Sequence, residues 1–434
     1  MTQNLIPAID AFTTFTDQYA DLFHDKRLHK GFQACITGIL ASGTTRLSRI
    51  ARAAPQTGLA PHSERRFRRM MHNQNKRSDL NAEKISKKIL EQGAKRLRNC
   101  DEVKVILDGS DLRKPYSTSL EHLSTVRDLN GHPIPGYPTL NAIGINPAGQ
   151  QTLLYHKTYS PLETDFKSER DEVRIAIQTI TIALRAQGVG RIIWILDRGF
   201  DDRKVIDWIL KTKACFVIRA QHDRVVSTGL SGPTQKLFKV TRAEPILGTF
   251  SMKRPVLIDG KLKKRPVQAS ARAGTVWLSE PKTRVNAVAL EFVQTRGKRD
   301  DTGWILLTNL PVESFEAAQH VILLYVLRWS IEEVFAWTKT ALDWESTQLL
   351  EFAAFELLVA IAWVTAAFVF ELSDSLEPGV LDRIAFLGGF VPRVGSSPGR
   401  RVLVLGLGRV LSSLLVEQML SVHERNALRT AFMR

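Results

Sequence analysis

The stretch from Tyr325 to Lys339 constrains this chain most, and it reads Y-V-L-R-W-S-I-E-E-V-F-A-W-T-K. An α-helix turns by about 100° per residue, so a helix here brings four polar side chains into one narrow stripe. The four are Tyr325, Arg328, Glu332 and Lys339. Many charged stripes are only solvated faces with a weak ion pair. Apolar residues fill about half of this helix's circumference, a wider arc than a surface helix has. We therefore expect the stripe to point into a functional site.

The order and spacing of the four polar residues resemble the Tyr-Arg-Glu-Lys signature of a large branch of bacterial insertion-sequence transposases, which belong to the DDE class. The likeness includes the R-W-x-I-E-E core from Arg328 to Glu333. The resemblance implies that Glu332 is the third carboxylate of a catalytic Asp-Asp-Glu set. It also implies that Tyr325, Arg328 and Lys339 hold DNA phosphates around that carboxylate.

The charge of the chain is strongly positive and is concentrated in two stretches. The formal net charge is +16 over 434 residues. Residues 44–77 hold nine Arg or Lys against one Glu, and residues 224–299 hold sixteen against four. Localised positive charge of this kind indicates a polyanionic partner, most simply nucleic acid.

Other features exclude several classes of protein. The three cysteines, Cys35, Cys100 and Cys215, are isolated, which predicts neither a disulfide framework nor a zinc knuckle. The N-terminus lacks the basic and apolar regions of a signal peptide. The uncharged run of 14 residues from Leu357 to Phe370 is too short to span a bilayer and predicts a core helix. We therefore expect a cytoplasmic protein that does not associate with a membrane.

The region after residue 100 reads as an α/β core. Strands are predicted at 103–108, 139–145 and 152–158, with a turn at 133–138 before the second of them. A helix at 168–187, a strand at 191–196, a helix at 202–211 and a strand at 215–218 are predicted to follow. Three antiparallel strands followed by alternating helix and strand are the order of the ribonuclease H-like fold. Asp108 is predicted to end the first strand and Asp197 to follow the fourth.

The predicted fold class is therefore α/β, a ribonuclease H-like core with a mixed sheet, a β-rich insertion, and helical regions at both ends. The insertion contains short β-rich runs, the first of them a predicted strand at 236–240, and it lies where the resembling transposases carry one. The predicted divisions are a helical DNA-binding domain at 1–100, the first part of the core at 101–220, the basic β-rich insertion at 221–304, the catalytic helix at 305–345, and a helical C-terminal region at 346–434.

Two aspartates complete the predicted catalytic set. Asp111 is the rival for the first position, but Asp108 directly follows the apolar V-I-L of the strand and matches the first aspartate of the resembling family. Asp197 alone would read as a helix-start aspartate. Phosphodiester transfer suits two Mg²⁺ ions held by a few carboxylates, and Mn²⁺ is expected to substitute for them. Asp108, Asp197 and Glu332 are the predicted metal ligands.

The first hundred residues are expected to contact DNA. Two short helices are predicted across a Pro- and Gly-containing turn, with Thr44–Thr45 as an N-cap of the first helix. The second helix carries four arginines, Arg65, Arg66, Arg68 and Arg69. The pair fits a helix-turn-helix reader of the major groove, or a basic helix that touches phosphates only.

Two further residues are assigned to DNA from the resemblance. Arg219 closes the fifth strand of the predicted core and is expected to hold a phosphate. Trp304 opens the run G-W-I-L-L-T, where the resembling transposases place a tryptophan that stacks on a flipped base. The alternative for Trp304 is a place in a buried strand.

The predicted function is that of a transposase that binds the terminal inverted repeats of its element and moves it by cut-and-paste, through a DNA hairpin. Its partners would be double-stranded DNA and a second copy of itself on paired ends. Another ribonuclease H-like nuclease would share the carboxylates, and a domesticated DNA-binding protein would have lost cleavage. The three carboxylates argue against the second alternative.

Overall fold

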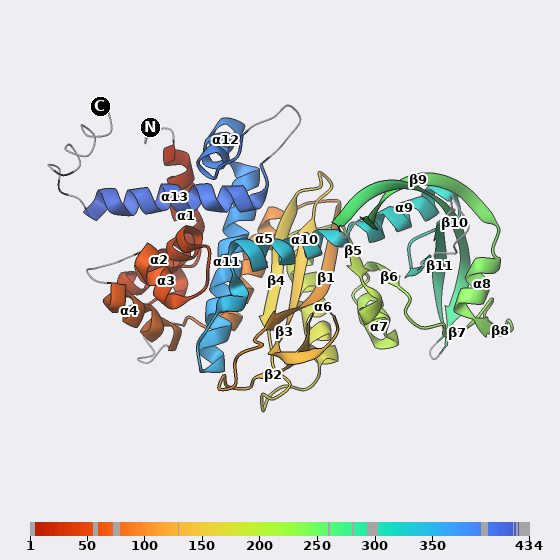
Figure 1. The fold of residues 1–434 in the computed structure, drawn as a ribbon. Helices are drawn as coiled ribbons and strands as arrows, with labels where there is room; N and C mark the ends of the chain where they lie inside the picture. Colours follow the sequence, from red (N-terminus) through yellow and green to blue (C-terminus); the bar gives the residue numbers. More distant parts are fainter. Residues whose placement is uncertain are drawn as a thin grey trace.

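The computed structural model describes residues 5–54, 60–72, 79–128, 130–258, 261–279, 282–292, 303–391, 398–419, 421 and 424. Helices gather around one large mixed sheet (Figure 1). Its strands are β1 (Glu102–Arg113), β2 (Ser124–Arg127), β3 (Pro133–Ile145), β4 (Gln151–Thr158), β5 (Arg191–Leu196), β6 (Cys215–Arg219), β7 (Val225–Ser227), β8 (Thr234–Lys236), β9 (Ile246–Ile258), β10 (Lys261–Leu278), β11 (Thr283–Phe292) and β12 (Trp304–Thr308).

The twelve strands run in the order β2-β3-β1-β5-β6-β12-β11-β10-β7-β8, with β4 beside β3 and β9 beside β10. β1 is antiparallel to β3 and parallel to β5, and β5 is parallel to β6. The predicted strands of the α/β core are all confirmed. The prediction that residues 133–138 form a turn is wrong, because β3 begins at Pro133 and pairs there with β2.

The prediction that Asp108 ends the first strand is also wrong. β1 continues to Arg113 because β3 pairs with it as far as Gly136. The parallel neighbour β5 stops earlier, where Leu196 lies opposite Leu107. Asp108 therefore lies inside a strand, at the point where one of its two neighbouring strands ends.

The strands of the basic insertion extend the same sheet. β12 pairs with β6 on one side and with β11 on the other, which joins the two groups of strands. β9 and β10 form a long ribbon that arches over the end of the molecule (Figure 1). The strand predicted at residues 236–240 is wrong, since α8 (Leu237–Ala243) begins there. Leu237, Val240 and Thr241 are buried with the spacing of one helical face.

Helices cover both faces of the sheet. Besides α8, the described helices are α1 (Ile6–Asp17), α2 (Lys26–Ser42), α3 (Leu47–Ala53), α4 (Ala60–His72), α5 (Ala82–Arg96), α6 (Glu169–Ala186), α7 (Arg203–Lys211), α9 (Phe315–Val326), α10 (Trp329–Ala341), α11 (Phe352–Ser375), α12 (Pro378–Leu387) and α13 (Arg400–Met419). One core contains α6, α7 and one face of β1, with Val103, Val105 and Leu107. The other core contains Ile106 from the opposite face, together with α10, α11 and the N-terminal helices.

Helix α11 stands between the N-terminal helices and the sheet (Figure 1), and it packs against α2, α4, α5 and β4. It is 24 residues long and apolar, so by length and composition alone it could cross a membrane. However, 83% of its most apolar stretch is buried inside the structure. It has the packing of a core helix, although it is longer than the run of 14 residues on which that prediction rested.

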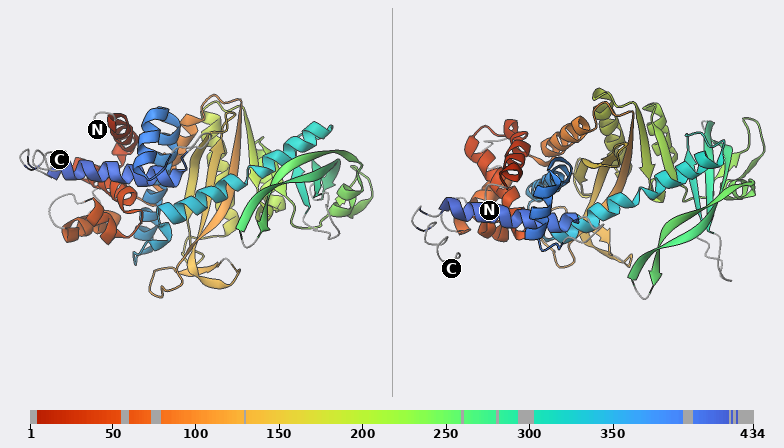
Figure 2. Two further views of the ribbon diagram at one scale, coloured as in Figure 1. Left: turned by 45° about the horizontal axis from the view of Figure 1, so that its top comes forward. Right: turned by 90° about the horizontal axis from the view of Figure 1, so that it is seen from above.

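The predicted single helix through Tyr325–Lys339 consists of two helices. α9 and α10 follow each other along almost one line across the sheet (Figure 2). Between them, the amide of Arg328 donates to the carbonyl of Tyr325 at 3.0 Å and that of Ser330 to Leu327 at 2.9 Å. These bonds span three residues, as in a 3₁₀ turn, which is often found at functional positions within helices. The backbone that carries the four polar residues is therefore wound more tightly at Arg328 than in an α-helix.

Candidate active site

The first carboxylate comes from the middle of the sheet. Side chains alternate between the two faces of a strand, so Asp108 shares the face of Ile106, which is the face that α10 covers. Its Oδ1 accepts a hydrogen bond from the amide of Gly109 at 2.9 Å. Asp197 directly follows β5. Because Leu196 lies opposite Leu107, the residue after each is an aspartate, and the two aspartates are neighbours.

Arg328 connects all three predicted catalytic carboxylates. Its Nη1 lies 3.2 Å from Asp108 Oδ2, and its Nη2 lies 2.7 Å from Glu332 Oε1. Its Nε lies 3.8 Å from Asp197 Oδ1 and has no hydrogen-bond partner. The side chain of Arg328 is only 8% exposed, whereas that of Glu332 is 42% exposed. A buried guanidinium therefore supplies the positive charge at the centre of the three carboxylates.

Tyr325 stabilises the second carboxylate. Its hydroxyl donates a hydrogen bond of 2.7 Å to Asp197 Oδ1, and its ring is buried. The sequence predicted that Tyr325 and Arg328 hold DNA phosphates. In the structure, Tyr325 donates a hydrogen bond to Asp197, and Arg328 forms ion pairs with the carboxylates. Contact of either residue with phosphate stays a prediction.

The two aspartates have pKa values shifted in opposite directions. Burial raises the pKa of Asp108 to about 7, against the attraction of Arg328 and with the repulsion of Asp197. Burial also acts to raise the pKa of Asp197, but the hydrogen bond from Tyr325 and the charge of Arg328 outweigh it and lower that pKa. Of the two aspartates, Asp108 thus holds a proton more readily near neutral pH.

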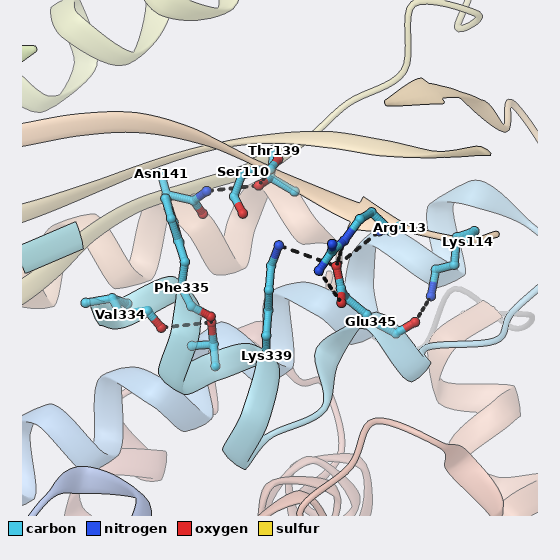
Figure 3. Close-up of polar contacts among 10 residues, drawn as sticks. Ser110, Arg113, Lys114, Thr139, Asn141, Val334, Phe335, Lys339 and Glu345 are labelled. Atoms are coloured by element: carbon cyan, nitrogen blue, oxygen red, sulfur yellow. Dashed lines mark hydrogen bonds and ion pairs between the residues drawn. The ribbon is translucent and has the colours of Figure 1, made fainter. Parts of the chain in front are cut away.

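Lys339 occupies a separate cluster. Its Nζ lies 3.4 Å from Glu345 Oε1, and the same carboxylate accepts a hydrogen bond of 3.0 Å from Arg113 Nε (Figure 3). Burial lowers the pKa of Lys339, with the charge of Glu345 opposing it. The sequence did not single out Arg113 or Glu345, because neither belongs to the stripe and their meeting depends on the fold. Asp111, the rival of Asp108, is also near Lys339 and not among the contacts of Arg328.

Trp304 and Arg219 lie beside Tyr325. The ring of Trp304 packs edge-on against that of Tyr325, with centroids 5.1 Å apart, and against Phe292 at 6.0 Å. The guanidinium of Arg219 lies over the indole at 5.9 Å. Trp304 is 8% exposed, so stacking on a base would require the indole to leave these contacts.

The four arginines of the N-terminal region lie on α4. This helix lies apart from β1, β5 and α10, the elements at which the carboxylates lie (Figure 1). Arg65, Arg68 and Arg69 are exposed and Arg66 is half-buried. α4 packs against α3, and α3 against α2. The connection at 55–59 lies outside the described residues, and helix-turn-helix geometry stays a prediction. The predicted N-cap at Thr44–Thr45 is wrong, because α3 has Arg46 as its N-cap, without a side-chain bond.

The three carboxylates have the chemistry of a magnesium site. Carboxylate oxygens are the ligands that Mg²⁺ and Mn²⁺ prefer. Among the described residues, no three Asp, Glu, His or Cys side chains are grouped closely enough to hold a metal ion as they stand. Because Asp108, Asp197 and Glu332 all surround one guanidinium, we judge that they fit divalent cations in its place.

The family model of the transposase DDE domain matches residues 100–368, which is more than half of the chain and includes all three carboxylates. This match places the α/β protein in the transposase class. The chain belongs to the transposase DDE domain family.

Proposed function

We propose that this protein is a bacterial insertion-sequence transposase of the Tyr-Arg-Glu-Lys branch, with a ribonuclease H-like core. It would bind the inverted repeats at the ends of its element and move the element by cut-and-paste, through a hairpin intermediate. The observation that carries the proposal is the convergence of Asp108, Asp197 and Glu332 on Arg328. A protein that only binds DNA does not need a cluster of three carboxylates.

Each residue of the site has a role in this chemistry. Asp108, Asp197 and Glu332 would hold two Mg²⁺ ions, or Mn²⁺ as a substitute, and bound cations offset charge on the attacking and leaving oxygens. The two aspartates come from adjacent strands, which gives their carboxylates a rigid base. Tyr325 orients Asp197 through its hydroxyl. Arg328 would exchange its carboxylates for a DNA phosphate, because guanidinium binds both groups through the same donors.

The partners follow from the same proposal. Double-stranded DNA would contact α4, with Lys339 and Arg219 as further phosphate ligands nearer the carboxylates. Two copies would be needed to pair two element ends, so we expect a dimer on DNA. The protein would act in the cytoplasm on the nucleoid, without a membrane.

The test is a cleavage assay with purified protein on DNA that carries the sequences flanking the reading frame. We expect cutting at the element ends only, dependent on Mg²⁺ or Mn²⁺, followed by joining to a second DNA. Cutting without regard to the end sequence would indicate another nuclease. Tight binding without cutting would indicate a protein that has lost catalysis.

Replacing Arg65, Arg68 and Arg69 together with alanine should weaken binding to end DNA and flatten its salt dependence. Each phosphate contact adds about 0.9 to the log–log slope, so the loss of three should lower the slope by about 2.7. The measurement is a fluorescence-anisotropy titration at several salt concentrations.

The control replaces Lys204 and Lys211 with alanine. Both are exposed on α7, which packs on the face of the sheet away from α10. We expect this control to leave the slope unchanged. An unchanged slope in the arginine variant would remove α4 from the DNA interface.

Trp304→Ala tests the hairpin step. Extruding a base costs a few kcal/mol, and stacking on an aromatic ring returns about 1–3 kcal/mol, so one ring can decide whether the distorted end is populated. We expect the first nick to stay near normal and the second-strand step to slow several-fold in a gel time course. Equal slowing of both steps, with earlier melting, would show that Trp304 only packs against Tyr325.

A further inference from the structure

The segment 343–347 directly follows α10, and three separate parts of the chain contact it. Asp343 has φ of 47°, a left-handed conformation that lets the chain turn sharply after the helix. Trp344 and Thr347, further along the segment, are buried. Glu332 and Lys339 lie on α10, directly before this segment, so a shift of the segment would also shift the site.

The N-terminal helices contact this segment through two buried threonines. Thr44 Oγ1 donates a hydrogen bond of 2.8 Å to Asp343 Oδ2. Thr45 Oγ1 donates to the carbonyl of Asp343 at 3.0 Å and accepts from Thr347 Oγ1 at 2.8 Å. Thr44 is 1% exposed and Thr45 is fully buried. Water cannot easily replace these bonds, so they fix the start of α3 relative to the end of α10.

Strand β1 contacts the same segment from the other side. The amide and the guanidinium of Arg113 donate to Glu345, with the Nε contact at 3.0 Å (Figure 3). Lys114 is buried and donates to the carbonyls of Glu345 and Thr347, the latter at 2.7 Å. The strand that carries Asp108 is thus connected to the same few residues.

We infer that residues 343–347 set the distance between the DNA sequence that the N-terminal helices bind and the phosphodiester bond that the carboxylates cut. The inference rests on the proposed function. The segment joins three elements that must be in register: α3 at the start of the basic helix pair, α10 with Glu332, and β1 with Asp108. One base-pair step is about 3.4 Å. Movement of a few ångströms between α3 and α10 would therefore displace the cut by one nucleotide.

Asp343→Gly tests this positioning role. Glycine adopts positive φ without strain, so the turn is kept while the acceptor of Thr44 is removed. The probe is an end-labelled duplex that contains the element end, cut in Mg²⁺ and mapped at single-nucleotide resolution. We expect the variant to bind with an affinity within about 2-fold of the parent and to cut at several adjacent positions. The parent should cut at one position.

A second pair of variants keeps the test decisive if Asp343→Gly does not fold. Thr44→Val removes the hydroxyl at similar volume and should also scatter the cuts, whereas Thr44→Ser keeps the hydroxyl and should restore one position. The matched control is Glu351→Gln. His72 Nδ1 lies 2.7 Å from Glu351 Oε2, a contact that joins α4 to the start of α11 and not to the catalytic helix. This control should cut like the parent.

The outcomes separate the inference from the proposed function. Single-position cutting by folded Asp343→Gly or Thr44→Val protein overturns the inference and leaves the function standing. Equal scatter in Glu351→Gln also overturns it, because any contact between the two regions would then suffice. A parent protein that cuts no end DNA overturns the proposed function, and the inference with it.

Discussion

Glu332→Gln should bind end DNA like the parent protein and cut it at least about 1,000-fold more slowly. Glutamine keeps the shape of the side chain and can still accept from Arg328, which lies 2.7 Å away, so the fold should survive. The variant loses the negative charge that would hold a metal ion. Metal ions supply several kcal/mol of transition-state stabilisation, and 1.36 kcal/mol corresponds to tenfold in rate. Single-turnover cleavage and an anisotropy titration measure the two effects.

The neighbouring residue provides the control for this experiment. Glu333→Gln makes the same chemical change at the next position, on an exposed part of the helix. We expect it to cut at close to the parent rate. If Glu333→Gln lost cleavage and Glu332→Gln retained it, the third carboxylate would be Glu333, and the contact between Arg328 and Glu332 would be only structural.

The neighbouring strands of the site could be predicted from local patterns. Apolar residues lead to Asp108 at the end of the predicted strand 103–108 and to Asp197 directly after the predicted strand 191–196, and parallel pairing of the two strands places Asp108 beside Asp197. The extension of β1 to Arg113 was not predictable from its own residues. It depends on pairing with β3, in which Arg113 meets Gly136. Strand length is thus decided by the partner strand as much as by local preference.

The sequence predicted that Arg328 and Glu332 lie together, but not the turn between α9 and α10 or the other contacts of Arg328. The four-residue spacing of Arg328 and Glu332 does place their charges together, as the helical repeat requires. The tightened turn at Arg328 carries no Pro or Gly that would predict a break. The contacts of Arg328 with Asp108 and Asp197 depend on where the helix crosses the sheet, which the helix sequence alone does not specify.

Contacts between segments far apart in the sequence could not be predicted from local patterns. Thr44 and Asp343 are separated by 299 positions, and a Thr-Thr pair before a short helix is typical of an N-cap. The same hydroxyl groups instead bond to Asp343, directly after the catalytic helix. In α8, the spacing of Leu237, Val240 and Thr241 contained a helical signal, which the surrounding β-rich composition obscured.

Arg328→Gln should lower the free energy of unfolding by about 3–5 kcal/mol in metal-free buffer at pH 8. That is the usual cost of removing one partner from a buried ion pair. Asp108, Asp197 and Glu332 would then face one another without a cation. Chemical denaturation, followed by circular dichroism, measures the loss.

The deficit of Arg328→Gln should also depend on pH and on metal. Burial already raises the pKa of Asp108 to about 7, above its unfolded value near 4. Between these values the folded protein binds more protons than the unfolded chain, so this group's contribution to stability falls as pH rises. Loss of the guanidinium should raise that pKa further, which makes the deficit smaller at pH 5.5 than at pH 8.

A divalent cation should replace the missing charge in Arg328→Gln. Mn²⁺ at 100 times its dissociation constant adds about 2.7 kcal/mol to a protein that binds it only when folded. At one fixed Mn²⁺ concentration the gain should be larger in the variant than in the parent, because Arg328 no longer competes for the carboxylates and the dissociation constant is smaller. Arg113→Gln breaks a comparable ion pair, with Glu345 at 3.0 Å, and should gain no more from Mn²⁺ than the parent does. Equal stabilisation of all three proteins would show that the cation does not bind where Arg328 now lies.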